Sequence, residues 1–328
     1  MHLHTILTWF SPTYSALFSP LLWSYRWRLL AFQPLALLIN SLKYLPLLFS
    51  PRYTVLRIPV RNKHANTSRR FLAPLHLDIH GGGFLGGIAE MDFPFCSRLS
   101  DLTGTVVVST EYRHAPAYPF PAAHEDVDDV VDWLFHNAGS ELGADRGMFT
   151  VSGFSAGGNL ALAVSQGRRC RRGERMKVKG SVTFYAPVDL RVPPEKKPVP
   201  PGYPKIDPLR FLLPLYDSYA GQGNPREVTD SRLHPILADV ETLPRNMLFI
   251  IPTIDIPLHE QLTFVERMKA DLHKKGVKET ERKVESIIFE KGFHGWLEVP
   301  SFAIDEQTRT EAFNAAFQFI GEIHTRYS

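Results

Sequence analysis

From residue 54 onward, short apolar runs alternate with longer stretches of helical periodicity. Runs that fit strands lie at 55–59, 75–79, 105–109, 148–151, 181–185, 247–251 and 284–289. Helical stretches lie between many of them, notably at 126–137, 156–166 and 259–274. Strands that alternate with helices predict a mostly parallel sheet covered by helices on both faces. The predicted fold class is therefore α/β.

Residues 191–210 interrupt this alternation. They include the proline-rich run 192–201 and lead into an apolar stretch, 209–219, that predicts a helix. The pattern therefore predicts an insertion between the fifth and sixth of these strands.

The first 50 residues differ from the rest of the chain. They are rich in Leu, Phe, Trp and Tyr, and their only charged side chains are Arg26, Arg28 and Lys43. The segment lacks the basic start of a signal peptide. Its best apolar window, 29–39, is shorter than the roughly 20 residues that a membrane span needs. We expect an amphipathic cap that lies over the rest of the protein or on a membrane surface.

Composition and charge narrow the class of protein. A hydrophobic fraction of 44% is enough for one large core. Two cysteines make no disulfide framework, so we expect a reducing compartment, with the protein cytoplasmic or peripherally membrane-associated. The net charge of +3 indicates no acidic partner. The one basic cluster, 168–175, fits the end of a helix, so we expect no nucleic-acid partner.

The segment Gly-Phe-Ser-Ala-Gly-Gly-Asn-Leu at 153–160 carries the clearest chemistry. It follows an apolar run and precedes a helical stretch, which is the context of a G-x-S-x-G nucleophile elbow. Gly153, Ala156 and Gly157 are small enough to let the backbone turn sharply and expose the hydroxyl of Ser155. The pattern predicts Ser155 as a nucleophile.

Three further segments follow predicted strands in the order that this chemistry requires. The turn His80-Gly81-Gly82-Gly83 ends the strand at 75–79 and can aim backbone N–H groups at a developing oxyanion. Asp255 follows the strand at 247–251, and His294 follows the strand at 284–289. The order Ser, Asp, His along the chain is typical of α/β-hydrolases.

These segments resemble the hormone-sensitive-lipase-like branch of the α/β-hydrolases, over about residues 74 to 300. The other matching segments are Tyr112-Arg113, 119–123 with Asp126, and Glu260 after Asp255. The chain departs from the branch at Phe154, where Asp is usual. It departs again within 255–260, although the spacing of the acid and the glutamate is kept. The resemblance implies a catalytic domain at 51–328, with a cap from residues 1–50 and a lid at about 191–222.

The resemblance also implies a carboxylic ester hydrolase, an esterase or lipase-like enzyme that forms an acyl-enzyme. Ser155 would attack the ester, His294 would take its proton and Asp255 would orient the imidazole. The implied oxyanion donors are the N–H groups of Gly82, Gly83 and Ala156. Such a reaction needs no cofactor and no metal.

The expected partner is a small-molecule ester, and nothing in the sequence predicts an oligomeric state. Phe84, Phe154 and Trp296 flank the predicted site along the chain, and the first 50 residues and 209–219 are apolar. These features favour small to medium apolar acyl esters or natural-product esters. Peripheral membrane contact through residues 1–50 is compatible with the same pattern.

Three other hypotheses fit parts of the sequence. Gly81, Gly83 and Gly86 match the G-x-G-x-x-G of a nicotinamide-dependent oxidoreductase, but Pro94 interrupts the helix that should follow. A non-catalytic small-molecule receptor on the same fold would not need His294. The alternation of histidine and aspartate at 76–80 could suggest metal ligands, but ordinary strand alternation explains it and we expect no metal.

Overall fold

The computed structural model describes residues 9–44, 47, 54, 72–166, 177–205, 210–221, 229–278, 280–299 and 304–328. Two sequence predictions, the strand at 55–59 and the basic helix end at 168–175, lie outside these described residues.

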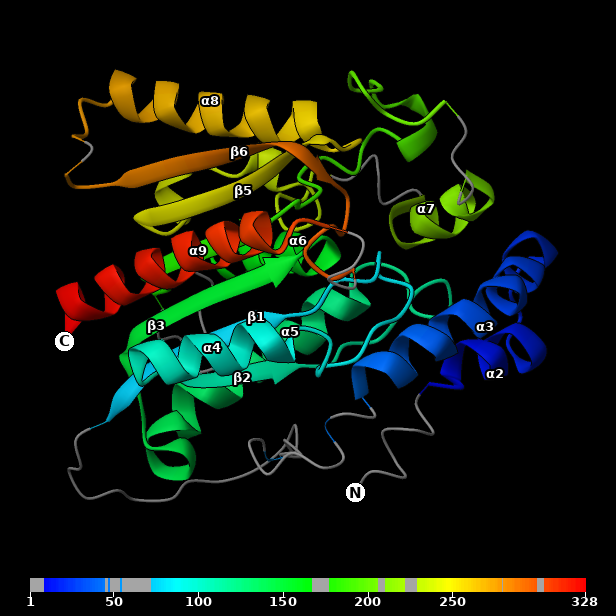
Figure 1. Ribbon diagram of the computed structural model, residues 1–328, viewed down its shortest axis with the longest axis horizontal. Helices are drawn as coiled ribbons and strands as arrows, with labels where there is room; N and C mark the ends of the chain where they lie inside the picture. Colours follow the sequence, from blue (N-terminus) through cyan, green and yellow to red (C-terminus); the bar gives the residue numbers. More distant parts are fainter. Residues whose placement is uncertain are drawn as a thin grey trace.

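A parallel sheet of six strands, in the order β2-β1-β3-β4-β5-β6, forms the centre of the protein (Figure 1). Its strands are β1 (Ala73–Ile79), β2 (Val106–Thr110), β3 (Ala144–Phe154), β4 (Gly180–Phe184), β5 (Asn246–Ile254) and β6 (Lys283–Phe293). The central strands β3, β4 and β5 are almost wholly buried, as apolar parallel strands covered on both faces should be. Each strand overlaps a predicted run, and the predicted α/β class is confirmed.

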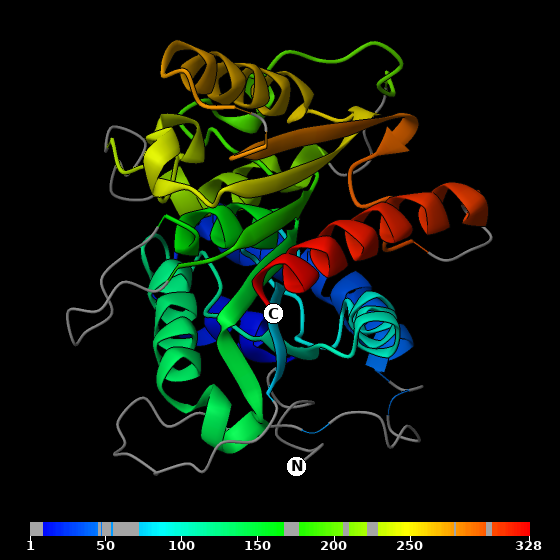
Figure 2. The same ribbon diagram turned by 90° about the vertical axis from the view of Figure 1, so that its left-hand side faces the viewer.

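Helices cover the sheet on both faces (Figure 2). One layer consists of α4 (Phe93–Thr103) and α9 (Glu306–Tyr327), and the other of α5 (Ala122–Asn137), α6 (Ala156–Val164) and α8 (Leu258–Lys274). In α8, Phe264, Met268 and Leu272 repeat at four-residue spacing and are buried against the sheet, while Glu266 and Lys269 are exposed on the outer side. The predicted helices at 126–137, 156–166 and 259–274 differ from α5, α6 and α8 only at their ends.

Two helices near the N-terminus, α2 (Ser11–Phe18) and α3 (Trp23–Tyr44), lie beyond the carboxyl ends of the strands (Figure 1). Helix α2 packs on α3, and α3 contacts α7 (Leu213–Gly221), the helix within the insertion. Arg28 Nε donates a 2.8 Å hydrogen bond to the carbonyl of Phe211, and the ring of Trp27 stacks on Phe211 at 6.3 Å. The N-terminal segment and the insertion are thus packed together at this edge of the sheet.

Candidate active site

The turn from β3 into α6 holds Ser155 in an unusual backbone conformation, with φ 49° and ψ −119°. A non-glycine residue with positive φ is uncommon and marks strain that the surroundings must hold in place. The neighbours allow it because they are small. A Cβ atom on Gly153 would overlap the carbonyl of Gly157, and one on Gly157 would overlap the carbonyl of Ile79. The sequence folds this way because glycine alone fits at those two positions.

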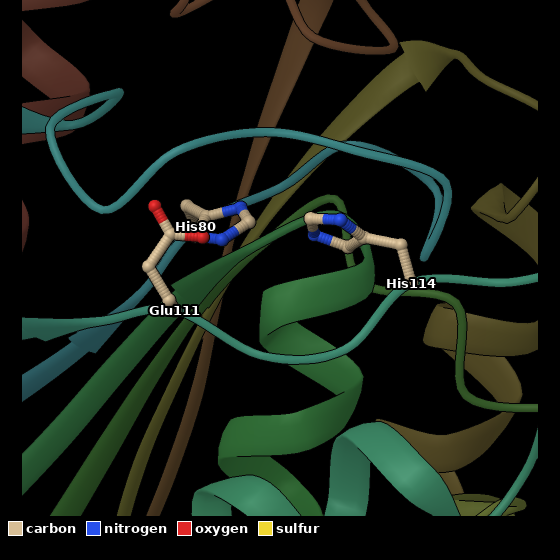
Figure 3. A group of neighbouring side chains, drawn as sticks. All are labelled: His80, Glu111 and His114. Atoms are coloured by element: carbon tan, nitrogen blue, oxygen red, sulfur yellow. The ribbon is translucent and has the colours of Figure 1, made fainter. Parts of the chain in front are cut away.

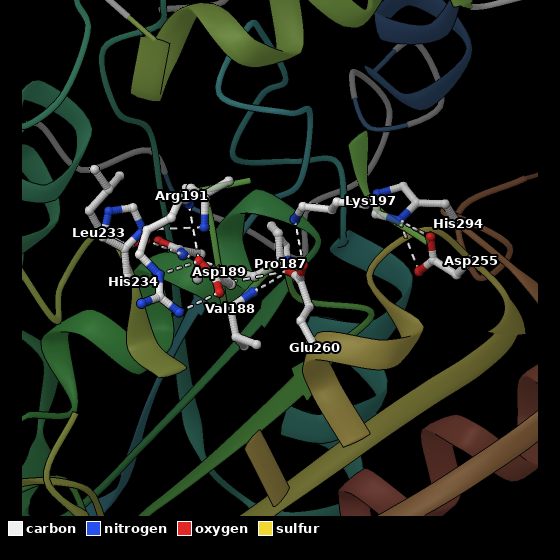
Figure 4. A network of polar contacts seen from close by, with 12 residues as sticks. Pro187, Val188, Asp189, Arg191, Lys197, Leu233, His234, Asp255, Glu260 and His294 are labelled. Atoms are coloured by element: carbon white, nitrogen blue, oxygen red, sulfur yellow. Dashed lines mark hydrogen bonds and ion pairs between the residues drawn. The ribbon is translucent and has the colours of Figure 1, made fainter. Parts of the chain in front are cut away.

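Folding brings together the three residues predicted to form a triad. Ser155 Oγ donates to His294 Nε2 at 2.7 Å. On the other side of the ring, His294 Nδ1 lies 2.9 and 3.1 Å from the two carboxylate oxygens of Asp255 (Figure 4). The carboxylate can only accept, so Nδ1 carries the proton and Nε2 is free to take one from the serine. The strand ends of β3, β5 and β6 position this hydrogen-bonded row.

Burial and charge favour a basic imidazole. Asp255 is only 1% exposed, whereas the side chain of His294 is 45% exposed and therefore open to solutes. Burial lowers the pKa of His294, whereas the charge of Asp255 and the hydrogen bond to its carboxylate raise it. The raising effects are the larger, so the net pKa lies above the ordinary value of 6.5. The histidine is thus set up to accept a proton from Ser155 and to be stabilised once charged.

The predicted oxyanion turn lies beside the serine. A Cβ atom built on Gly81 would lie 3.5 Å from Ser155 Cβ. Gly82 and Gly83 have φ values of 113° and 61°, which favour glycine. Within the described part of the chain, the N–H groups of Gly82, Gly83 and Ala156 have no hydrogen-bond acceptor. They are therefore available to an incoming negative charge.

Helix α7 packs directly on this turn. A side chain on Gly83 would run into the ring of Tyr216, because that ring packs directly on the backbone of Gly83. Phe84 stacks on Tyr219 with ring centroids 4.1 Å apart, and the hydroxyl of Tyr219 lies 2.6 Å from His124 Nδ1. The predicted insertion therefore covers the oxyanion turn from above, although its role as a lid stays a prediction.

Two charged residues that were not predicted as site residues lie next to the triad. Lys197, from the insertion, pairs with Glu260 of α8 at 2.5 Å, and both side chains are nearly buried (Figure 4). Glu260 also accepts from the backbone N–H groups of Val188 and Asp189. The positive charge of Lys197 lowers the pKa of His294 slightly against the stronger effect of Asp255. The spacing of Glu260 after Asp255 was a signal, whereas a lysine in a proline-rich run gave none.

Glu298, four residues after His294, was also missed. The hydroxyl of Tyr185 donates to Glu298 Oε2 at 3.3 Å, and the Tyr185 ring lies 5.3 Å from the ring of His294. Burial raises the pKa of Glu298, and its charge raises the pKa of His294. No sequence pattern pointed to this carboxylate because its partner Tyr185, which directly follows β4, lies in a distant part of the chain.

The aromatic side chains that flank the site along the sequence are buried in the core. Phe84, Phe154 and Trp296 are 3%, 1% and 2% exposed. Phe154 stacks on Phe184 at 4.2 Å, within the cluster between the sheet and α9. These three rings therefore do not line an exposed surface around the site, because nearness along the chain does not place side chains on the same surface.

A second group of serine, histidine and aspartate lies inside the sheet. Ser152 Oγ donates to Asp78 Oδ1 at 2.5 Å and lies 2.8 Å from His76 Nε2. All three residues are fully buried, so no substrate reaches Ser152. His76 also bonds Thr150 on β3, which explains the polar positions of β1 as a buried network.

The oxidoreductase hypothesis fails on geometry. The helix after β1 begins at Phe93, well past Gly86, and Pro94 lies in its first turn. Gly86 therefore does not open a helix whose N-terminus could bind a pyrophosphate.

A parallel sheet with a strained serine between β3 and α6, and with an aspartate and a histidine after later strands, defines an α/β-hydrolase. A family model described as alpha/beta hydrolase fold matches residues 76–298. The chain therefore belongs to the α/β-hydrolase family, and the resemblance to its hormone-sensitive-lipase-like branch is confirmed.

Similar proteins are named as esterases. Ethyl acetate hydrolase of Pseudomonas putida is 31% identical over 186 residues, 56% of each chain. Esterase LipI of Mycobacterium tuberculosis is 39% identical over 97 residues, 30% of each chain. The aligned part of the chain therefore covers 56% of the length of the first relative and 30% of the length of the second. The solved esterase of Pyrobaculum calidifontis is 30% identical with a TM-score of 0.61, over 78% of each chain.

Proposed function

We propose that the protein hydrolyses carboxylic esters with Ser155 as nucleophile, His294 as general base and Asp255 as the group that orients the base. The observation that carries this proposal is the continuous hydrogen-bonded row from Ser155 Oγ through the imidazole to the buried carboxylate. The esterase names of its relatives support the same reaction class.

In the first half-reaction, Ser155 Oγ attacks the ester carbonyl while its proton moves to His294 Nε2. The charged imidazole is stabilised by Asp255 and then donates that proton to the departing alcohol, leaving an acyl-enzyme. A water molecule then adds to the acyl carbonyl, with His294 again as base, and releases the acid and the free serine. Each proton taken by the imidazole is returned, so the cycle needs no other group.

The N–H groups of Gly82, Gly83 and Ala156 would bind the oxyanion formed in both steps. They are preorganised by the positive-φ glycines and by the N-terminus of α6. One such donor contributes roughly 3 kcal/mol to the stability of a transition state.

The proposed substrates are small to medium apolar acyl esters or natural-product esters. Support comes from apolar side chains of α3 and α7, such as Leu29, Leu215 and Tyr219, which belong to one buried cluster, with the two helices in contact beyond the carboxyl ends of the strands (Figure 1). The experiment is a p-nitrophenyl series of rising acyl length. We expect wild-type turnover that depends on chain length, and at most background hydrolysis by Ser155→Ala. Equal slow turnover by both proteins would instead fit a non-catalytic receptor.

We also propose peripheral membrane contact through the outward face of α2 and α3. Its large exposed side chains are apolar and recur mostly at three- and four-residue spacing: Phe10, Tyr14, Leu17, Phe18, Leu22, Trp23, Trp27, Leu30, Leu35, Leu38 and Leu42. Residues 9–44 contain no acidic side chain to repel anionic lipid. Within the described ranges, no helix combines the length and apolarity that crossing a bilayer requires.

Sedimentation with anionic vesicles tests this contact. We expect the wild type to bind and the double variant Trp23→Glu/Leu38→Glu to stay in the supernatant. Leu102→Glu is the matched control, because Leu102 is equally exposed but lies on α4. Equal sedimentation of the double variant and the wild type would refute the proposal.

A further inference from the structure

The loops that follow β1 and β2 bring two histidines and a glutamate together (Figure 3). One potential ligand atom from each of His80, Glu111 and His114 lies within 4.8 Å of the others. None of the three takes part in the triad, although His80 begins the predicted oxyanion turn.

The tautomer of His80 leaves a lone pair without a partner. Its Nδ1 lies 2.7 Å from the carbonyl of Gly81, which can only accept, so Nδ1 carries the proton. His80 is fully buried, and its Nε2 has no hydrogen-bond partner within the described residues. The Nε2 of His114 is likewise buried and unpartnered there. Buried polar atoms are almost always satisfied, so two such atoms in one place call for a ligand.

The remaining group, Glu111, completes the donor set. One of its oxygens accepts a 3.0 Å hydrogen bond from the N–H of Ala89, which orients the carboxylate, and the side chain reaches solvent. An imidazole that carries its proton on Nδ1 presents the lone pair of Nε2, and metals bind this form of the ring.

We propose that His80, Glu111 and His114 bind one divalent transition-metal ion of the zinc type, with solvent in the remaining position. Two imidazoles and one carboxylate suit zinc, cobalt, nickel or copper better than calcium or magnesium, which prefer oxygen ligands only. Tetrahedral ligands at bonds of 2.0–2.1 Å lie about 3.3 Å apart, so the site closes by a small movement of the solvent-facing Glu111. The bond from His80 Nδ1 to a backbone carbonyl is the usual outer support of a metal-bound histidine.

Metal at this position would fasten the oxyanion turn to the loop after β2. His80 begins that turn, and the ring of Tyr112 stacks on it with centroids 4.4 Å apart. The hydroxyl of Tyr112 already donates to the carbonyls of His80 and Gly81 at 3.0 and 3.1 Å. A bound ion adds a link between the same two loops, so it should raise the melting temperature of the protein.

The test is a zinc titration of the intact, untagged, chelator-dialysed protein against a chromophoric chelator. We expect one equivalent bound by the wild type, and affinity at least about tenfold weaker in His114→Leu and in Glu111→Gln, because even outer-shell partners are worth 10–100-fold. His136→Leu is the matched control, since His136 is exposed on α5, and it should bind as the wild type does. Circular dichroism establishes that each variant is folded.

His294→Ala separates this site from the triad. This variant should keep one equivalent of zinc, whether or not the protein is an esterase. Cobalt substitution should give the visible absorption of a four-coordinate ion in the wild type and not in His114→Leu. Equal zinc affinity in folded wild type and His114→Leu, loss of zinc in His294→Ala, or no stoichiometric binding to the wild type would each overturn the proposal.

Discussion

The same three residue types meet twice in this protein, once at the end of the sheet and once inside it. Ser155 lies on a strained turn beyond β3, next to an exposed histidine, whereas Ser152 lies within β3 and is sealed on every side. Both serines are hydrogen-bonded to a histidine, at 2.7 and 2.8 Å. Only at the first site does the histidine bridge the serine and the aspartate. At the second, the serine itself bonds the aspartate at 2.5 Å. Access and order of the bonds, rather than residue types, distinguish a candidate triad from a structural network.

The largest expected effect is that of Ser155→Ala. Removal of the nucleophile should lower kcat by at least about 10⁴-fold. The melting temperature should change little, because the turn is held by the surrounding glycines. Steady-state kinetics on a p-nitrophenyl ester measures the first quantity, and a residual rate within tenfold of wild type would contradict the assignment.

Asp255→Asn should lower kcat by about 10⁴-fold, because an amide cannot hold the imidazole with its proton on Nδ1. Asp78→Asn provides the contrast within the buried group. Burial raises the pKa of Asp78 to about 7, so a neutral side chain there is tolerated and kcat should stay within a few-fold of wild type. A similar loss of kcat in both variants would mean that the buried group also takes part in catalysis, and would contradict this distinction.

Gly83→Ala tests the oxyanion turn. The added methyl group meets the ring of Tyr216, and kcat should fall by about 10²- to 10³-fold as the donor moves away. Gly104→Ala is the matched control: its φ of 64° resembles the 61° of Gly83, yet open space surrounds it. It should cost about 1 kcal/mol of unfolding free energy and leave kcat unchanged.

Ser152→Ala should damage stability rather than activity. It leaves His76 and Asp78 without a shared partner in the interior, which costs about 1–3 kcal/mol of unfolding free energy. Chemical denaturation measures that loss. A drop in kcat as large as that of Ser155→Ala, in a folded protein, would mean that the buried group takes part in the chemistry.

The smallest effect concerns pH. The net pKa of His294 is raised above its ordinary value, and kcat/KM should fall as pH is lowered through this raised pKa, because the imidazole then loses its free lone pair. The raised pKa also stabilises the folded protein at low pH, and that contribution is lost as pH rises through the folded-state pKa. In Lys197→Met/Glu260→Gln, removal of the lysine charge should move the acid limb to higher pH. A shift to lower pH would contradict the charge effect.

The sequence predicted the fold well because its signals are local. Strands of β-branched and aromatic residues separated by amphipathic helices can be recognised from the sequence pattern alone. The glycines at 153 and 157 can also be recognised, because a larger side chain would overlap a backbone carbonyl in the sharp turn. Asp255 and His294 were found because each directly follows a strand, where parallel sheets gather functional groups. Their catalytic roles stay predictions until tested by mutation.

What the sequence missed depends on contacts between distant segments. Lys197 reaches Glu260, and Tyr185 reaches Glu298, through the tertiary fold alone. His114 gives no signal along the chain because its neighbour His80 lies on a different loop. Phe154 illustrates the converse: it adjoins the nucleophile in sequence, but strand alternation places its ring in the core.

The central claim is that Ser155, and not its buried counterpart, forms the covalent intermediate. Reaction of the folded protein with a fluorophosphonate, followed by peptide mapping in a mass spectrometer, tests it directly. A single adduct on Ser155 that disappears in His294→Ala is the predicted result. An adduct on Ser152, or no adduct on a fully folded wild-type protein, would contradict it.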